Sequence, residues 1–232
     1  MGSLTVMMMA TPIFGLSLTP PSVPLLSVTP TLTLFQDAEV AASSDEEEPQ
    51  SDDATYSREL RERAETASLH RTLGIVTWAS MTVTVAMGVI QYHNLYGFFA
   101  DRDSNPCVTG DAIFGQEQCS GVPYLHLASA LITTGLYSAT FTLSLMMPDP
   151  DDSSEGESEF ASTLRTHKLL RWVHFGGMIA QSLLGFFIAN SELFGMDRAN
   201  DYGTLQALAT LHGGIGLVTY GALTWAGALM TF

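Results

Sequence analysis

Four long apolar stretches, at about residues 71–96, 124–147, 169–190 and 204–231, are the main pattern along this chain. Each is long enough to cross the ~30 Å hydrocarbon layer of a bilayer as an α-helix. Strands with open edges are excluded there, because backbone polar groups in lipid must be hydrogen-bonded internally. The pattern predicts an all-α fold: an integral-membrane four-helix bundle over residues 56–232, with both chain ends on one side. Residues 56–69 alternate Arg with Glu and are expected to form a solvated helix that runs into the first span.

Residues 1–55 have a different character. Residues 1–36 are apolar but contain five prolines, which prevent a stable helix because each removes a donor and clashes with the preceding turn. Residues 37–55 are acidic and are expected to be disordered, since they cannot bury a core. A cleaved signal peptide ending near residues 41–43 is the alternative for the first part, although no Lys or Arg precedes Arg58 to form a basic n-region. A signal peptide would invert the topology.

The charge of the chain excludes some classes of function. The formal net charge is −15, yet only 14% of the residues are charged and 46% are hydrophobic. The acidic residues are concentrated in residues 37–65 and 149–159, outside the four apolar stretches. A surface this negative argues against nucleic-acid binding, which requires basic side chains. The expected surroundings of the protein are membrane lipid.

The basic residues predict the orientation. The loops and helix ends on the N-terminal side contain Arg58, Arg61, Arg63, Arg71, Arg165, Lys168 and Arg171, whereas the opposite side contains Arg102 and Arg198. Cytoplasmic loops carry the excess of Lys and Arg, so both termini are expected in the cytoplasm. The loop with Cys107 and Cys119 would then lie on the periplasmic or extracellular side, where the two thiols can pair. Two unrelated free thiols are the alternative.

The four stretches also match each other in pairs, which indicates two copies of a helical hairpin. With an offset of 97, the first and third stretches match at His70–His167, Leu73–Leu170, Val76–Val173, Met81–Met178 and Gly88–Gly185. With an offset of 86, the second and fourth match at Leu125–Leu211, His126–His212, Leu131–Leu217, Thr133–Thr219 and Gly135–Gly221. Each copy contributes one histidine near the start of each helix. Hairpins of equal orientation would be related by a pseudo-twofold axis along the membrane normal.

This symmetry predicts two metal sites. His70 and His167 enter from the N-terminal side, and His126 and His212 enter from the opposite side. In a four-helix bundle each pair would face across a core diagonal, where two neutral imidazoles can bind one haem iron. The two pairs would lie about 25–30 Å apart at ~1.5 Å rise per residue. Histidines that only bridge helices by hydrogen bonds, or that lie in the headgroup zone, are the alternative.

Other residues are candidates for secondary roles around the cofactors. His174 lies seven residues after His167 and could contact the first haem, line a quinone pocket or replace His167 as a ligand. His93 could bond a haem propionate or lie in the headgroup zone. Arg71, Lys168 and Arg171 flank the first pair and could hold propionates or an anionic donor. Setting the topology is the alternative for these cations.

Histidines on the first and third, and on the second and fourth, of four core helices resemble the cytochrome b561 superfamily. The resemblance covers about residues 66–232 and implies two b-type haems, held by His70 with His167 and by His126 with His212. It also implies electron transfer across the membrane, with no catalytic residue of the protein's own. The chain departs from the family in its cysteine-bearing loop and long acidic segments, and the substrate site of the ascorbate-using members is not recognisable. The expected partner is therefore a redox protein or a quinone, and the chain could be a subunit of a larger membrane complex. The alternatives are a quinol-oxidising cytochrome b subunit and a haem-free membrane anchor or assembly protein.

Overall fold

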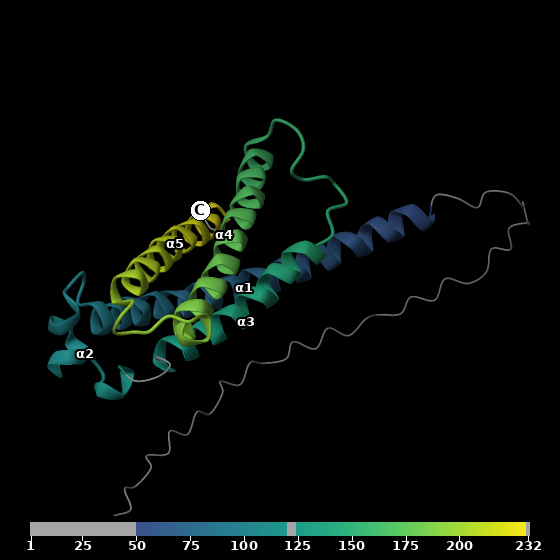
Figure 1. Cartoon of the computed structure of the whole chain (residues 1–232). Coiled ribbons are helices and arrows are strands. Elements are labelled where there is room, and N and C mark those ends of the chain that lie inside the picture. Colours follow the sequence, from purple (N-terminus) through teal and green to yellow (C-terminus); the bar gives the residue numbers. More distant parts are fainter. Residues whose placement is uncertain (1–49, 120–123, 231–232) are drawn as a thin grey trace, which may run out of the picture. The chain divides into compact units, whose positions relative to one another are not determined.

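The computed structural model describes residues 50–119 and 124–230, which belong to the second of the two units into which the chain divides, at residues 46 and 47. The regular elements of these described residues are helices (Figure 1). They are α1 (Gln50–Tyr96), α2 (Pro106–Thr109), α3 (Tyr124–Met146), α4 (Glu159–Ala189) and α5 (Tyr202–Leu229), with short 3₁₀ turns at Arg102–Ser104, Gln116–Gln118 and Ser191–Phe194. The all-α prediction is confirmed for this part of the chain. The predictions for residues 1–49 lie outside it.

Helix α1 is longer than the span predicted within it. The expected continuation of residues 56–69 into the first span is confirmed, because one uninterrupted helix covers both. Residues 50–55, which the sequence analysis assigned to the disordered acidic segment, are instead the first turns of this helix. Asp52 and Asp53 lie in its first turn, where carboxylates are favoured by the helix dipole. Similarly, α4 begins at Glu159, with the Ser158 hydroxyl accepting a hydrogen bond from the Ala161 amide.

The four long helices form two antiparallel hairpins, α1 with α3 and α4 with α5 (Figure 1). Small and hydroxyl side chains fill the seam inside each hairpin. In the first, the hydroxyls of buried Thr77 and Thr140 lie 2.9 Å apart. In the second, Gly177 lies directly against buried Thr219. Small residues let helix backbones approach closely, which is how helices associate in lipid as well as in water.

Larger side chains hold the two hairpins together. Between α3 and α4, the rings of Phe141 and Phe175 stack with their centroids 4.3 Å apart. Between α1 and α5, Trp78 stacks on Tyr220 at 6.3 Å. The buried core between these contacts consists of Met81, Tyr137 and Met178. The helices therefore lie closer together within each hairpin than between the two hairpins.

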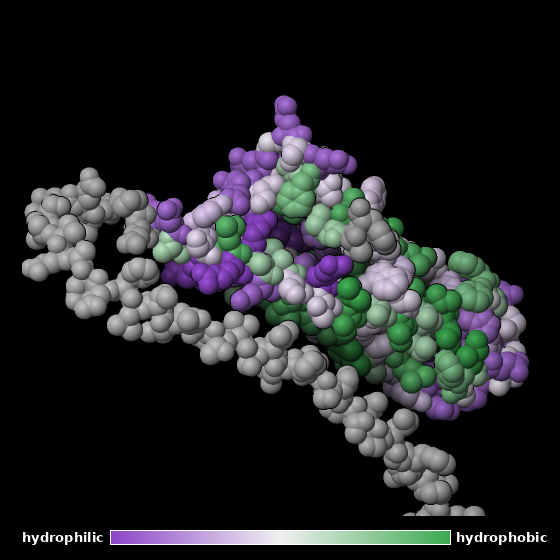
Figure 2. All heavy atoms as spheres, turned by 180° about the vertical axis from the view of Figure 1, so that it is seen from behind, coloured by the Kyte–Doolittle hydropathy of each residue, from purple (hydrophilic) through white to green (hydrophobic). Residues whose placement is uncertain are grey.

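The outside of the bundle is apolar. Ile75, Leu131, Leu183 and Val218, one from each long helix, expose 60–66% of their surface. Figure 2 shows that hydrophobic side chains gather over the bundle, between more hydrophilic ends. Among the described residues, two helices are long and apolar enough to cross a membrane, Asp52–Tyr96 of α1 and the whole of α4.

The loop between α1 and α3 is cross-linked and anchored. Cys107 and Cys119 form a disulfide, so the predicted pairing is confirmed. Fully buried Asn94 of α1 bonds both the amide and the carbonyl of Ile113. Gln91 donates a hydrogen bond to the Gln118 carbonyl at 3.1 Å. The segment between the two cysteines is thus fixed to the end of α1 at two points.

Candidate functional site

Two of the predicted ligands, His70 on α1 and His167 on α4, face each other across one diagonal of the bundle; we call them the inner pair. Their ring centroids are 6.3 Å apart and their planes are almost perpendicular, at 86°. The Nδ1 atom of His70 lies 3.1 Å from the Thr140 carbonyl oxygen, and that of His167 lies 2.9 Å from the Ala226 carbonyl oxygen. With Nδ1–H donating to a carbonyl, Nε2 of each ring keeps its lone pair for a metal.

The other two predicted ligands, His126 on α3 and His212 on α5, form the outer pair across the second diagonal. Their centroids are 6.2 Å apart and their planes meet at 88°. Their Nδ1 atoms are buried and make no hydrogen bond to any described residue, although the Thr84 carbonyl lies near the His126 ring. Instead, each ring lies against a glycine of the neighbouring helix, His126 against Gly88 and His212 against Gly185.

These contacts recur at the offsets that relate the histidines. Thr140 and Ala226, which accept from the inner pair, are 86 residues apart, as are His126 and His212. Gly88 and Gly185 are 97 apart, as are His70 and His167. The interior positions on α1 and α4 recur every three or four residues, which is the spacing of a left-handed helix bundle. On α1 and α4 this spacing places His70 and His167 on the same interior face as Gly88 and Gly185.

The geometry of both pairs fits one iron atom between two imidazoles. A metal–imidazole bond is ~2.0–2.1 Å long and the nitrogen lies ~1.1 Å from its ring centroid, so two such bonds in line separate the centroids by ~6.3 Å. The measured separations are 6.3 and 6.2 Å. No cluster of three or more His, Cys, Asp or Glu able to hold a bare metal ion occurs among the described residues. A haem iron requires only two protein ligands, because the porphyrin supplies the others.

No hydrogen bond or ring contact among the described residues joins His174 to either pair. It is buried in the core of the bundle, where its Nδ1 lies 2.8 Å from the Tyr137 hydroxyl. The rings of these two residues meet edge to face at 5.5 Å. Since Nδ1 is engaged by Tyr137, the Nε2 atom of His174 is the one left to interact with a further group.

Of the three cations predicted near the inner pair, Arg171 is the best placed to meet an anion there. It follows His167 by one helical turn, donates to the Ser144 carbonyl at 3.1 Å and lies over the Trp172 ring. Its Nε atom is buried and has no partner among the described residues. Lys168, in contrast, is bound to the Asp149 carboxylate and the Ser154 hydroxyl. Arg71 is exposed.

His93 is not brought to either pair by any contact that the structure records. It lies one turn before the end of α1, with its ring 5.1 Å from that of Phe98. Its Nδ1 is buried without a hydrogen-bond partner in the described part of the chain. The predicted role at a propionate or in the headgroup zone stays a prediction.

The acidic loop between α3 and α4 lies over the basic end of the bundle. Asp149 pairs with Arg63 of α1 and with Lys168 of α4. Burial favours the neutral acid, but hydrogen bonds from Ser153, Lys168 and Arg63 outweigh it and hold the pKa of Asp149 well below its usual range. Tyr56 donates to Asp151, whose carboxylate raises the pKa of the tyrosine. The loop thus neutralises two of the cations counted in the sequence analysis.

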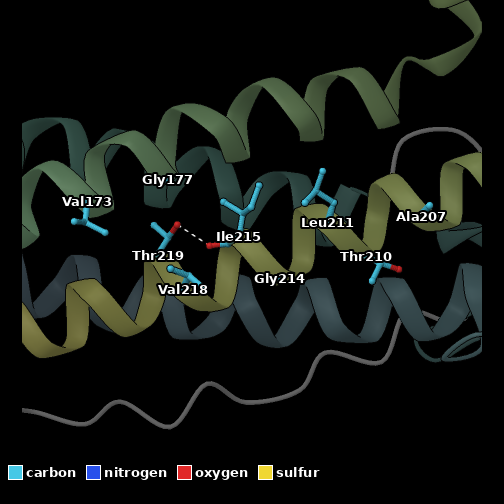
Figure 3. A pocket seen from close by; sticks show the side chains of 9 residues that line it. All are labelled: Val173, Gly177, Ala207, Thr210, Leu211, Gly214, Ile215, Val218 and Thr219. Atoms are coloured by element: carbon cyan, nitrogen blue, oxygen red, sulfur yellow. Dashed lines mark hydrogen bonds between the residues drawn. The ribbon is translucent and has the colours of Figure 1, made fainter.

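A separate groove of about 680 Å³ runs along the outside of α4 and α5 (Figure 3). It is mostly apolar and includes the contact of Gly177 with Thr219, whose hydroxyl donates to the Ile215 carbonyl. None of the candidate site residues lines it. The lining residues are Val173, Gly177, Ala207, Thr210, Leu211, Gly214, Ile215, Val218 and Thr219.

Sequence reasoning missed several residues of the site. Tyr137, the partner of His174, carries no motif, and its role depends on α3 meeting α4. The Thr140 and Ala226 carbonyls are backbone atoms, which no side-chain pattern reveals. One signal was available, because both residues occupy the interior spacing of their helices at the offset of the repeat.

Comparison of the chain with family models, with curated proteins and with solved structures finds no match in any of the three. Any assignment of function therefore depends on the geometry of the two histidine pairs.

Proposed function

We propose that this protein is an integral-membrane b-type cytochrome that binds two haems and transfers electrons from one face of the membrane to the other. The observation that supports this most directly is the pair of diagonal contacts, His70 with His167 and His126 with His212. Two imidazoles that only share a hydrogen bond lie closer together, whereas both of these pairs have the spacing that one iron requires. Two separate pairs with one spacing argue against coincidence.

The two pairs also lie at different depths. His126 is level with Gly88, which follows His70 by eighteen residues of α1, or about 27 Å of helix. A bilayer core is ~30 Å thick, so one pair would lie in each leaflet if α1 spans the membrane. Two redox centres at these depths divide the crossing into shorter electron transfers.

Membrane insertion of all four long helices is part of the proposal. The exposed Ile75, Leu131, Leu183 and Val218 favour it, because apolar side chains on the outside of a bundle are stable in lipid. The disulfide favours an oxidising compartment for the loop between α1 and α3. The cation count then favours a cytoplasmic position for the chain ends. The repeated contacts at offsets of 97 and 86 support an origin of the two hairpins by duplication.

The chain's own residues would hold the cofactors and set their surroundings. Each histidine would donate one Nε2 lone pair to iron, and the carbonyls of Thr140 and Ala226 would keep the inner rings in the required tautomer. Arg171 offers its unpaired Nε–H to a propionate or to an anionic donor at the inner pair. The stacked rings of Phe141 and Phe175 close one seam between the hairpins against water. When bound, haem supplies the one-electron chemistry.

The first test is a dithionite-reduced-minus-oxidised spectrum of the purified full-length chain, with the haem-to-protein ratio measured as pyridine haemochrome. We expect two b haems per chain, and one after either His167→Ala or His212→Ala. His93→Ala is the matched control and should keep two. Absence of haem after full reconstitution would reject the proposal and favour the haem-free membrane anchor. One haem in the unaltered chain would restrict it to a single pair.

A second candidate, oxidation of quinol, is favoured by one observation, the buried hydrogen bond between Tyr137 and His174. A histidine oriented by a tyrosine can accept a proton from a quinol hydroxyl through Nε2. His174→Ala should then abolish reduction by a soluble quinol while both haems remain bound. An unchanged quinol rate in that variant would reject this role and leave a redox protein as the electron donor.

A further inference from the structure

The rings of the outer pair are held differently from those of the inner pair, because each of them packs against a glycine. A Cβ atom added to Gly88 of α1 would lie 3.0 Å from Cε1 and 3.4 Å from Nδ1 of His126. A Cβ added to Gly185 of α4 would lie 3.3 Å from Cε1 of His212. The two Cβ–Cε1 distances, 3.0 and 3.3 Å, are shorter than an ordinary van der Waals contact. The two imidazoles therefore lie almost directly on the backbone of the neighbouring helix.

The inner rings are held differently. Their Nδ1 atoms lie 3.1 and 2.9 Å from backbone carbonyls, which limits rotation of the rings by hydrogen bonding. The glycine of α1 nearest this level is Gly74, where an added Cβ would only meet Thr140 Cγ2 at 4.0 Å. A methyl group is therefore accommodated next to the inner pair and not next to the outer pair.

We infer that Gly88 and Gly185 are positioning residues for the outer histidine pair. The absence of a side chain lets each imidazole lie back against the neighbouring helix and face its diagonal partner. This inference rests on the proposed function, because the position matters only if the pair binds one iron. At a centroid separation of 6.2 Å an iron held between the two rings would have both bonds close to their required length, so a ring moved by a few tenths of an ångström would bind it less well.

The test compares Gly88→Ala and Gly185→Ala with Gly74→Ala as the matched control on α1. We expect the affinity for the outer haem to fall about 10–100-fold in the first two variants, as for other changes behind a metal ligand. The effect should be larger at Gly88, where the added Cβ is closer. The low-spin electron paramagnetic resonance signal and the midpoint potential of the remaining outer haem should change, while those of the inner haem stay as they are. Gly74→Ala should keep both haems with unaltered signals.

Thermal unfolding of the haem-free variants separates positioning from misfolding, because a variant in which only the imidazole is displaced should still unfold in one cooperative transition with a Tm near that of the wild-type chain. If Gly88→Ala does not fold, Gly185→Ala carries the test with its milder contact. Two haems with unaltered signals and potentials in the folded variants would overturn the inference while the proposed function stands. A wild-type chain that binds no haem would overturn both.

Discussion

Replacing Gly177 by Ala tests how tightly α4 and α5 approach each other. The added Cβ would overlap Thr219 Oγ1 and lie 3.0 Å from both Cβ and Cγ2 of that residue. Thr219 is 1% exposed and its hydroxyl donates to the Ile215 carbonyl at 2.8 Å, so making room for the added Cβ means shifting a buried, hydrogen-bonded side chain. The preceding residue provides the control, because a Cβ at Gly176 meets nothing within 4 Å.

The magnitude follows from comparing the two variants. Both gain the same helix propensity, about 1 kcal/mol for Ala over Gly. Only Gly177→Ala also introduces an overlap in a close-packed seam, which typically costs about 1–3 kcal/mol. We therefore expect the free energies of unfolding of the two variants to differ by about 1–3 kcal/mol, with Gly177→Ala the less stable. For a chain of this size that corresponds to about 2–12 °C in Tm.

The assay is thermal unfolding of the full chain in detergent, followed by circular dichroism, in the wild-type and Thr219→Ala backgrounds. Removing Thr219 Oγ1 and Cγ2 should relieve most of the penalty, so the two substitutions should be coupled. Equal Tm values for Gly176→Ala and Gly177→Ala would refute the close approach of the two helices. A penalty at Gly177 that Thr219→Ala does not reduce would refute the assignment of the clash to that side chain.

Three further outcomes are expected. First, both pairs should bind haem with their imidazole planes near the observed angles of 86° and 88°. Both ferric centres should then give the highly anisotropic low-spin electron paramagnetic resonance signal of perpendicular imidazoles. A rhombic signal typical of parallel rings would contradict the geometry. Asp149→Asn should cost about 1 kcal/mol at pH 7, because both of its cations lose their partner. The pKa of Asp149 is lowered in the folded chain. Its contribution to the free energy of unfolding is therefore complete above the unfolded pKa of ~3.9 and is lost as the pH falls through the folded value. A Tm that falls equally with acid in the wild type and in the variant would reject this. Reducing the Cys107–Cys119 disulfide should lower Tm, since a loop of about this length contributes about 3 kcal/mol; the double Cys→Ser variant should match the reduced protein and be insensitive to reductant.

From the sequence alone, the residues that could be predicted to lie together are those that match at the two offsets. The offset of 97 brought His70 to His167, and the offset of 86 brought His126 to His212, which the structure places 6.3 and 6.2 Å apart in ring centroids. Hydrophobic period and length predicted the long helices, and α3 ends within one residue of its expected range. These features are readable because the helical period is a local property of the chain and because the residues that match at the two offsets face inward together.

Charge was the least reliable guide to the site. Lys168 and Arg171 are equally basic and lie three residues apart, yet Asp149 engages the first while the second keeps a buried, unpartnered Nε. The difference depends on where the loop after α3 folds back. A pattern of charges records how many cations lie near a helix end, but not which of them already has a counterion.

By itself, then, the sequence determined the helices, the apolar surface and the identity of the paired histidines, because each of these follows from local periodicity or from the internal repeat. Only the tertiary structure decided what surrounds them. It placed the Tyr137 hydroxyl on His174, the Thr140 and Ala226 carbonyls on the inner rings, and Gly88 and Gly185 against the outer rings. Such contacts join residues far apart in the chain, and they depend on the distance and rotation between helices, which no pattern along one helix specifies.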